Sequence, residues 1–350
     1  MTDGWTARDL LNMLVSQGFA HSSILLGSTG SPTGGSTDLE TSKRIFSRQK
    51  RALFFPSDMP SAECIVFKDS SFFQRNGSTS VLPSPSEVLA EAHIRGVQTD
   101  FRPPPVHYPS LGLTVKYGHA VSTIEGRCLW AIRKSLGDAV PVPEVYGWTK
   151  EGGVSYIYME YIPGETLSNR WDSLSDSEKR DICDQLRTMV GHLRTIQQPD
   201  GEKFIGTISR QPLLDYVFTT SAAPPMGPFA SVAEFHDLFV KLPDLQMPDP
   251  NDSPHPFRGE FPDDVPVVFT HADLNPSNII ISPATEQGMP RVKALIDWGQ
   301  SGWYPIYWEY CKALWTVDPE EEWGSTYIPL FLEHFDCFIY WDFFLLSMGI

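Results

Sequence analysis

The sequence predicts an α+β protein with two lobes, a small lobe in which strands and helices mix and a larger lobe that is mainly helical. Two observations predict this fold class. Short apolar segments rich in β-forming residues recur between Leu82 and Tyr161. Further on, Ser173 to Gln198 carries apolar residues at helical spacing. A chain of 350 residues with 41% hydrophobic residues is long enough to bury a core in each lobe.

The domain organisation follows from where these patterns start and stop. Trp5 to Gly18 has the apolar spacing of a short amphipathic helix, but the Gly/Ser/Thr-rich stretch after it argues against a compact unit. We therefore expect residues 1–60 to be a partly flexible N-terminal extension. Residues 61–161 are expected to form the N-lobe and residues 162–350 the C-lobe.

In the N-lobe, a lysine at the end of a strand is followed by a glutamate in a helix. Lys116 follows the apolar segment Leu111–Val115, and Glu125 lies in the next predicted helix. Such an ion pair directs a lysine toward the phosphates of ATP. Two alternatives remain, because Ser122 and Glu125 also match a capping box and Lys116 alone is compatible with a solvated strand end. A further strand is predicted from Val154 to Ile162.

The C-lobe begins with the clearest helix of the chain. Its predicted N-terminus is a capping box in which Ser175 and Glu178 bond each other's backbone. The apolar residues that follow at helical spacing are expected to be core: Ile182, Leu186, Met189, Val190, Leu193 and Ile196.

Three short apolar runs later in the C-lobe hold the most informative polar residues. Val265–Phe269, Asn278–Ser282 and Val292–Ile296 are predicted to be buried strands. They flank the loop between Thr270 and Ser277, in which Pro276 disfavours helix, and they end in Asp297. The sequence therefore predicts a rigidly mounted loop beside a strand-terminal aspartate.

The loop and the aspartate carry the groups that phosphoryl transfer from Mg-ATP requires. Asp273 is placed to orient an acceptor hydroxyl and take its proton, while Asn278 and Asp297 offer the oxygen ligands that Mg²⁺ prefers. The alternative for Asp273 alone is a turn or cap residue, and the alternative for His271 is a satisfied buried histidine. The order of all three oxygen-bearing groups favours a kinase-type site.

From about Ser61 to its end, the chain resembles the aminoglycoside phosphotransferase and choline kinase group of protein-kinase-like enzymes, and within it a fungal set of phosphotransferases. The resemblance lies in Leu82–Pro85, Val115–Gly118, Pro141–Gly147, Tyr158–Gly164, His271–Asn278, Ile296–Trp298 and Ser301–Pro305. It implies a bilobal protein-kinase-like fold and transfer of the γ-phosphoryl group of ATP, with Mg²⁺, to a hydroxyl of a small molecule. The implied acceptor is a cationic aminoglycoside- or choline-like alcohol.

The resemblance also implies a role for each site residue. Asp273 would be the catalytic base, and His271 would brace its loop without reacting. Asn278 and Asp297 would bind the metal. The residues expected to bind the nucleotide are Lys116, with Glu125 as its partner, and Glu160 and Tyr161, which belong to the segment whose backbone pairs with adenine.

Two departures from the family pattern keep other functions open. The residues before Lys116 contain no glycine cluster to cradle phosphates, and Asn275 stands where relatives in the fungal set more often carry histidine. A weakly active or inactive nucleotide-binding or scaffold protein is therefore an alternative. A protein kinase is disfavoured, since Trp298 replaces the usual Phe and no Ala-Pro-Glu motif follows.

Composition narrows the class of partner. A net charge of −16 argues against nucleic acid or an anionic membrane surface, and it favours a cationic acceptor. The acidic run Asp318–Glu322 is expected to be solvated, with the lining of such an acceptor pocket as the alternative. Five cysteines without metal-like spacing predict neither a disulfide framework nor a metal cluster. The oligomeric state is not predicted.

The two ends of the sequence bear on where the protein is located. No signal peptide is evident, and the apolar segment Phe331–Ile350 is interrupted by charges, so we expect a packed helix and a cytoplasmic protein.

An aromatic cluster follows Asp297 closely. Its members are expected to form either helix core or a wall for a cationic or planar acceptor: Trp303, Tyr304, Tyr307 and Trp308.

Overall fold

The computed structural model describes residues 52–54, 56–97, 103–218, 224–246, 255–318 and 321–350. All of them belong to one compact unit that extends from Gln49 to Ile350. The helix predicted from Trp5 to Gly18 lies outside the described residues. The division of the chain at residues 60 and 161 stays a prediction.

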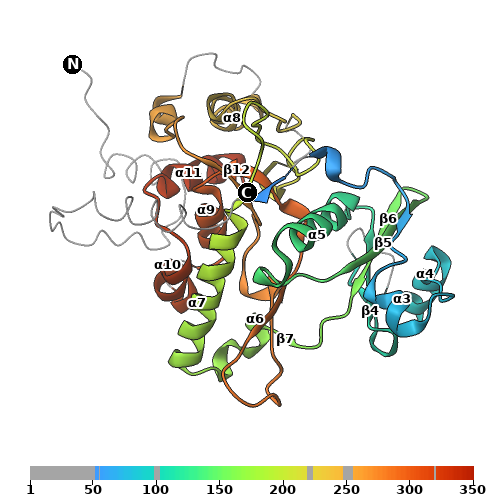
Figure 1. Cartoon of the computed structure of the whole chain (residues 1–350). Helices are drawn as coiled ribbons and strands as arrows, with labels where there is room; N and C mark the ends of the chain where they lie inside the picture. Colours follow the sequence, from blue (N-terminus) through green and yellow to red (C-terminus); the bar gives the residue numbers. More distant parts are fainter. Residues whose placement is uncertain (1–51, 55, 98–102, 219–223, 247–254, 319–320) are drawn as a thin grey trace, which may run out of the picture. The chain divides into compact units, whose positions relative to one another are not determined.

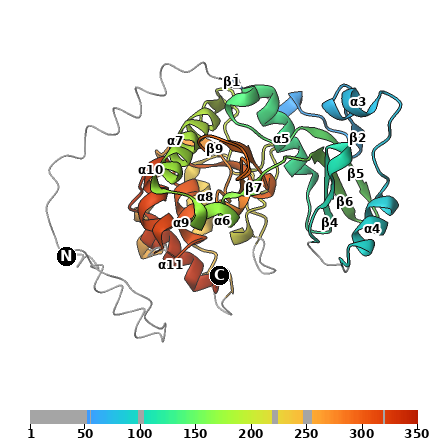
Figure 2. The ribbon, with the colours of Figure 1, turned by 90° about the horizontal axis from the view of Figure 1, so that it is seen from below.

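A five-stranded antiparallel sheet forms the centre of the N-lobe (Figures 1 and 2). Its strands, in spatial order, are β2 (Ile65–Val66), β5 (Val145–Glu151), β6 (Val154–Glu160), β4 (Leu113–Gly118) and β3 (Val106–Tyr108). Strand β4 lies between β6, which pairs with it along its whole length, and β3, which pairs with its first half. Lys116 therefore lies inside a strand with two partners.

The two faces of this sheet are covered by different helices. Side chains alternate along β4, so Leu113, Val115 and Tyr117 share one face and Lys116 lies on the other. The first face packs against α3 (Ser71–Asn76) and α4 (Pro85–Ile94). The second is contacted by α5 (Thr123–Leu136), and Figure 2 shows α5 across the sheet from α3 and α4.

Helices dominate the C-lobe, as predicted. The helix that begins at Ser175 runs as α7 (Asp176–Leu193), its capping box is formed, and its predicted apolar stripe is buried. The others are α6 (Leu167–Arg170), α8 (Val232–Phe239), α9 (Trp308–Trp315), α10 (Ile328–Phe331) and α11 (Phe338–Met348). The predicted bilobal α+β fold is confirmed.

Small β-sheets hold the loops of the C-lobe in place. Strand β9 (Val267–Thr270) pairs with β12 (Gly302–Pro305). Strand β10 (Ile279–Ile281) lies between β11 (Val292–Leu295) and β7 (Glu165–Thr166). The three predicted strands are thus present, but they form two separate sheets. A third pair, β1 (Ala52–Leu53) with β8 (Ile196–Gln197), is parallel.

The aromatic cluster after Asp297 is core, and its interpretation as an acceptor wall is wrong. Its four side chains are at most 1% exposed, because β12 and α9 pack them against the rest of the lobe: Trp303, Tyr304, Tyr307 and Trp308. The packed helix predicted in the segment Phe331–Ile350 is present as α11, which is shorter than the segment. Among the described residues, no helix is long and apolar enough to span a membrane. All five cysteines are free.

Candidate active site

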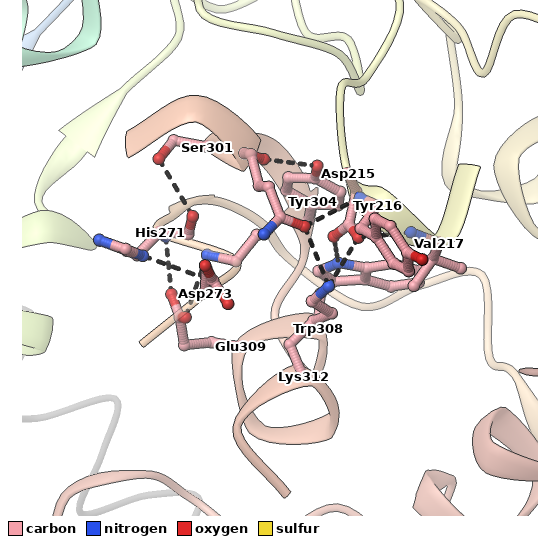
Figure 3. Close-up of polar contacts among 12 residues, drawn as sticks. Asp215, Tyr216, Val217, His271, Asp273, Ser301, Tyr304, Trp308, Glu309 and Lys312 are labelled. Atoms are coloured by element: carbon pink, nitrogen blue, oxygen red, sulfur yellow. Dashed lines mark hydrogen bonds and ion pairs between the residues drawn. The ribbon is translucent and has the colours of Figure 1, made fainter. Parts of the chain in front are cut away.

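The loop between β9 and β10 is held by a buried carboxylate from α9 (Figure 3). Glu309 Oε2 accepts a hydrogen bond from the backbone N–H of His271 at 2.7 Å, and Oε1 accepts one from Ala272 at 3.1 Å. Ser301 Oγ donates to the carbonyl of His271 at 3.0 Å. Ala272 has a positive φ of 64°, a conformation costly for a residue with a Cβ. These bonds hold the loop in that conformation.

His271 uses both ring nitrogens inside the protein. Nε2 lies 3.0 Å from the carbonyl oxygen of Ile296, and Nδ1 accepts from the backbone N–H of Asp273 at 3.2 Å. Burial lowers the pKa of His271 to about 4, so the ring is neutral near pH 7 and Nε2 carries the proton. This geometry suits a bracing residue. It leaves neither nitrogen available for the proton of a substrate.

Asp273 receives an amide group at each carboxylate oxygen. Asn275 Nδ2 donates to Oδ1 at 3.2 Å, and Asn278 Nδ2 donates to Oδ2 at 3.0 Å. Burial raises the pKa of Asp273 to about 6, although the positive charge of Lys312 and the bond from Asn278 act to lower it. Asn275 also caps the short turn Pro276–Asn278 by accepting from Ser277 N. The asparagine that departs from the family pattern is therefore part of the support of Asp273.

Asn278 and Asp297 lie at the same end of the β10–β11 pair. The antiparallel register joins Ile279 with Leu295, and Ile296 N donates to the carbonyl of Asn278 at 2.9 Å. Because the amide nitrogen of Asn278 donates to Asp273, its Oδ1 is the atom left to bind a cation. Asp297 adopts a left-handed conformation, φ 63°, before the turn Trp298–Gln300. One amide oxygen and one carboxylate suit Mg²⁺, which takes its other ligands from phosphate and water.

Lys116 joins the N-lobe sheet to this end of the site. Its Nζ lies 2.8 Å from Glu125 Oε2 on α5 and 2.7 Å from Asp297 Oδ1. Its side chain is only 20% exposed, so Lys116 is not a solvated strand end. Burial lowers the pKa of Lys116, but the two carboxylates outweigh burial and the net shift is upward. Glu125 binds Lys116. It does not form the capping box with Ser122 that was the alternative interpretation.

Six of the eight predicted site residues are thus linked, and Glu160 and Tyr161 are not. They lie at the end of β6, where Tyr161 N donates to the carbonyl of Gly112 at 3.1 Å and Glu160 N donates to that of Glu144 at 2.8 Å. In the part of the chain that the structure describes, no hydrogen bond or ion pair joins them to Lys116 or Asp297.

The sequence interpretation missed a second group of residues beside the loop. Lys312 Nζ forms an ion pair with Asp215 at 2.7 Å, and the two side chains are 1% and 0% exposed. Asp215 also accepts from Trp308 Nε1 at 2.9 Å and from Val217 N at 3.0 Å (Figure 3). One signal was available: Glu309 and Lys312 lie in the otherwise apolar segment Trp308–Trp315, and charges in such a segment indicate buried partners.

Residues 124–337 match the model of the phosphotransferase enzyme family. Subtelomeric hrmA-associated cluster proteins from two strains of Aspergillus fumigatus are 46% identical to this chain over 54 residues. That match covers 14% of the chain and 11% of the length of each relative.

Similar solved structures include aminoglycoside phosphotransferases. The type VIII aminoglycoside-3'-phosphotransferase is 16% identical, with 67% of this chain and 84% of that chain covered and a TM-score of 0.41. The enzyme APH(3'')-Id from Streptomyces rimosus, in complex with ADP and streptomycin, is 16% identical, with 77% and 100% covered and a TM-score of 0.42.

Proposed function

The chain belongs to the phosphotransferase enzyme family, and on this premise we propose that it is a kinase that transfers the γ-phosphoryl group of ATP to a hydroxyl of a small molecule, with Mg²⁺ as cofactor. One observation carries the proposal. Lys116 bonds Asp297 and Asn278 bonds Asp273, and the backbone bond from Ile296 N to the carbonyl of Asn278 holds these two pairs side by side, although Lys116 and Asp297 are 181 residues apart in sequence.

In the proposed reaction, Asp273 orients the acceptor hydroxyl and takes its proton. A pKa of about 6 leaves most of this carboxylate ionised at neutral pH while keeping it a competent base. The amides of Asn275 and Asn278 fix both of its oxygens, so the direction of proton transfer is set before the acceptor binds. His271, neutral and bonded at both nitrogens, keeps the loop in place.

The nucleotide side of the site would use the other linked residues. Asn278 Oδ1 and the Asp297 carboxylate would hold Mg²⁺, which would neutralise charge on the phosphate oxygens. Lys116, aimed by the buried Glu125, would contact the phosphates and release Asp297 to the cation. Glu160 and Tyr161 would meet the adenine through backbone groups. Residues 61–161 would thus supply the nucleotide elements, and residues 162–350 the loop and the acceptor pocket.

The test is turnover of Mg-ATP by the purified full chain. We would offer it amino-alcohols, aminoglycosides and neutral polyols, and detect ADP together with the phosphorylated product by mass spectrometry. An Asp273→Asn variant should lose turnover by about 10²- to 10⁴-fold, the range that a general base contributes. Asp264→Asn makes the same change at an exposed position near the start of β9 and should keep wild-type activity.

Two outcomes would count against the proposal. Full turnover by Asp273→Asn would remove the aspartate from the mechanism. Stabilisation by Mg-ATP without transfer to any member of the panel would instead favour a nucleotide-binding protein that lacks catalysis.

A further inference from the structure

Gln300 lies where the turn after Asp297 meets the loop that carries Asp273. It ends the short helical turn Trp298–Gln300, and the next residue, Ser301, donates to the carbonyl of His271 at 3.0 Å. Its position is therefore fixed to both halves of the site. Neither the family pattern nor the predicted site residues include it.

The orientation of the Gln300 amide is set by two donors. Lys312 Nζ donates to Oε1 at 3.1 Å, and the backbone N–H of Tyr216 donates to the same oxygen at 2.8 Å. An ammonium and a backbone N–H can only donate, so the atom between them must be the oxygen. The NH₂ group then points away from both. Within the described residues, no group accepts a hydrogen bond from it.

The segment around Tyr216 is held by the buried Asp215–Lys312 pair. Asp215 accepts from Lys312, from Trp308 Nε1 and from Val217 N, so its charge is fully compensated (Figure 3). The backbone on either side of Tyr216 is fixed as a result. Its side chain is 55% exposed and stacks on Trp315 with 6.5 Å between ring centroids.

We propose that Gln300 and Tyr216 form the acceptor subsite and that this subsite selects a neutral, oxygen-rich ring such as a sugar or cyclic polyol. The inference rests on the proposed kinase function. The NH₂ of Gln300 is free to donate to an acceptor atom, which a hydroxyl or ring oxygen supplies and a protonated amine cannot. A rigid aromatic ring beside a few oriented polar groups is typical of small-molecule sites.

The aromatic pair also offers little to a cationic acceptor. Trp315 already has a cation over its ring, since Lys312 Nζ lies 4.9 Å from the centroid. A second cation at Trp315 would have to compete for a ring that Lys312 already occupies. The subsite therefore departs from the cationic acceptor that the net charge of the chain favours.

The decisive variant is Gln300→Glu. A glutamate keeps an oxygen for Lys312 and for Tyr216 N, but it replaces the outward NH₂ by a carboxylate oxygen. The affinity of the full chain would be measured by isothermal titration in the presence of Mg²⁺ and AMP-PNP. The probes are two matched pairs, glucose with glucosamine and myo-inositol with an inositol monoamine.

We expect the wild-type protein to bind the neutral member of each pair more tightly. Gln300→Glu should reverse the preference and shift it by about tenfold toward the amine, because its carboxylate oxygen accepts a charge-assisted hydrogen bond from a protonated amine. Gln287→Glu makes the same change of charge at an exposed residue and should leave the preference unchanged. Thermal denaturation of both variants would verify that they are folded.

The outcomes distinguish failure of the subsite proposal from failure of the kinase proposal. Failure of both neutral rings to bind, or an equal preference in Gln300→Glu and Gln287→Glu, would overturn the subsite. A reversed preference without phosphoryl transfer would support the subsite and contradict the kinase. Transfer of phosphate without a change of preference would support the kinase alone and overturn the subsite.

Discussion

Glu309 connects α9 to two consecutive backbone amides of the loop that carries Asp273, and its burial makes its protonation sensitive to pH. Burial raises its pKa to about 7, although the bonds from His271 and Ala272 act to lower it. A carboxyl group whose pKa is raised by folding favours the folded state most when it is protonated in both the folded and the unfolded state. That contribution is present below the unfolded pKa of 4.5 and is lost as the pH rises through about 7.

Glu309→Gln should reveal this dependence. The glutamine cannot accept from both amides, so we expect a loss of about 1–3 kcal/mol of stability, together with slower turnover. Because the variant does not titrate, its deficit relative to wild type should shrink by about 2 kcal/mol between pH 5.5 and pH 8. Urea unfolding at the two pH values measures it. A deficit that stays constant, or that exposed Glu202→Gln reproduces, would contradict the assignment.

Some residues of the site can be predicted from the sequence, and others cannot. Asp273, Asn278 and Asp297 are predictable because they lie in one loop and at the end of the strand that follows. Lys116 and Glu125 are predictable because strand, lysine and helix occur in order. Asp215 and Lys312 form no local pattern, since 97 residues separate them and only tertiary packing brings them together. Gln300 is missed because its role depends on the direction of its amide.

At the scale of elements, Gly164 sets how closely β7 can approach β10. A Cβ added to Gly164 would lie 2.5 Å from the carbonyl oxygen of Ile281 and 2.6 Å from a methyl carbon of Ile280. Neither backbone can yield without weakening the pairing of β7 with β10. Since β10 begins directly after Asn278, the closeness of the two strands affects the position of Asn278.

We therefore expect Gly164→Ala to cost about 1–3 kcal/mol and to weaken binding of Mg-ATP. Gly191→Ala is the matched control, because this glycine lies inside α7 and a Cβ there meets nothing within 4 Å. The control should stabilise the protein by up to about 1 kcal/mol. Thermal unfolding with and without Mg-ATP would check both. Equal changes in the two variants would contradict the close approach.

Elements with local signals were predicted well, and their pairing was not. The capping box of Ser175 and Glu178 specifies the start of α7 within one short segment. The runs that became β9, β10 and β11 were likewise recognisable from their residues. The pairing of Phe269 with Trp303 was not predicted, because the aromatic segment that forms β12 is also compatible with a helix. Which strands pair depends on contacts distant in sequence.

At the scale of the whole molecule, Lys116 joins strand β4 of the N-lobe sheet to Asp297 in the C-lobe. Lys116→Met would leave the Glu125 carboxylate, in a residue only 2% exposed, without its cation. We expect a loss of about 3–5 kcal/mol of stability and of most of the stabilisation by Mg-ATP. Adding Glu125→Gln should restore part of the stability and none of the nucleotide response.

Urea unfolding and thermal shifts would measure these effects, with Lys150→Met on β5 as an exposed control. A double variant no more stable than Lys116→Met would show that the lysine does not compensate the buried glutamate. An undiminished response to Mg-ATP in Lys116→Met would remove the lysine from the nucleotide site.

The short parallel pair of β1 and β8 affects how recombinant fragments of this chain are best cut. A fragment beginning at residue 61, where composition suggests that the N-lobe starts, would omit Ala52 and Leu53 and expose the edge of β8. It would also lose Phe54, which is 5% exposed and donates from its backbone to the carbonyl of Gln197 at 2.9 Å. The vacated space and the open edge favour aggregation during expression. Fragments that begin at or before residue 49 keep the strand pair.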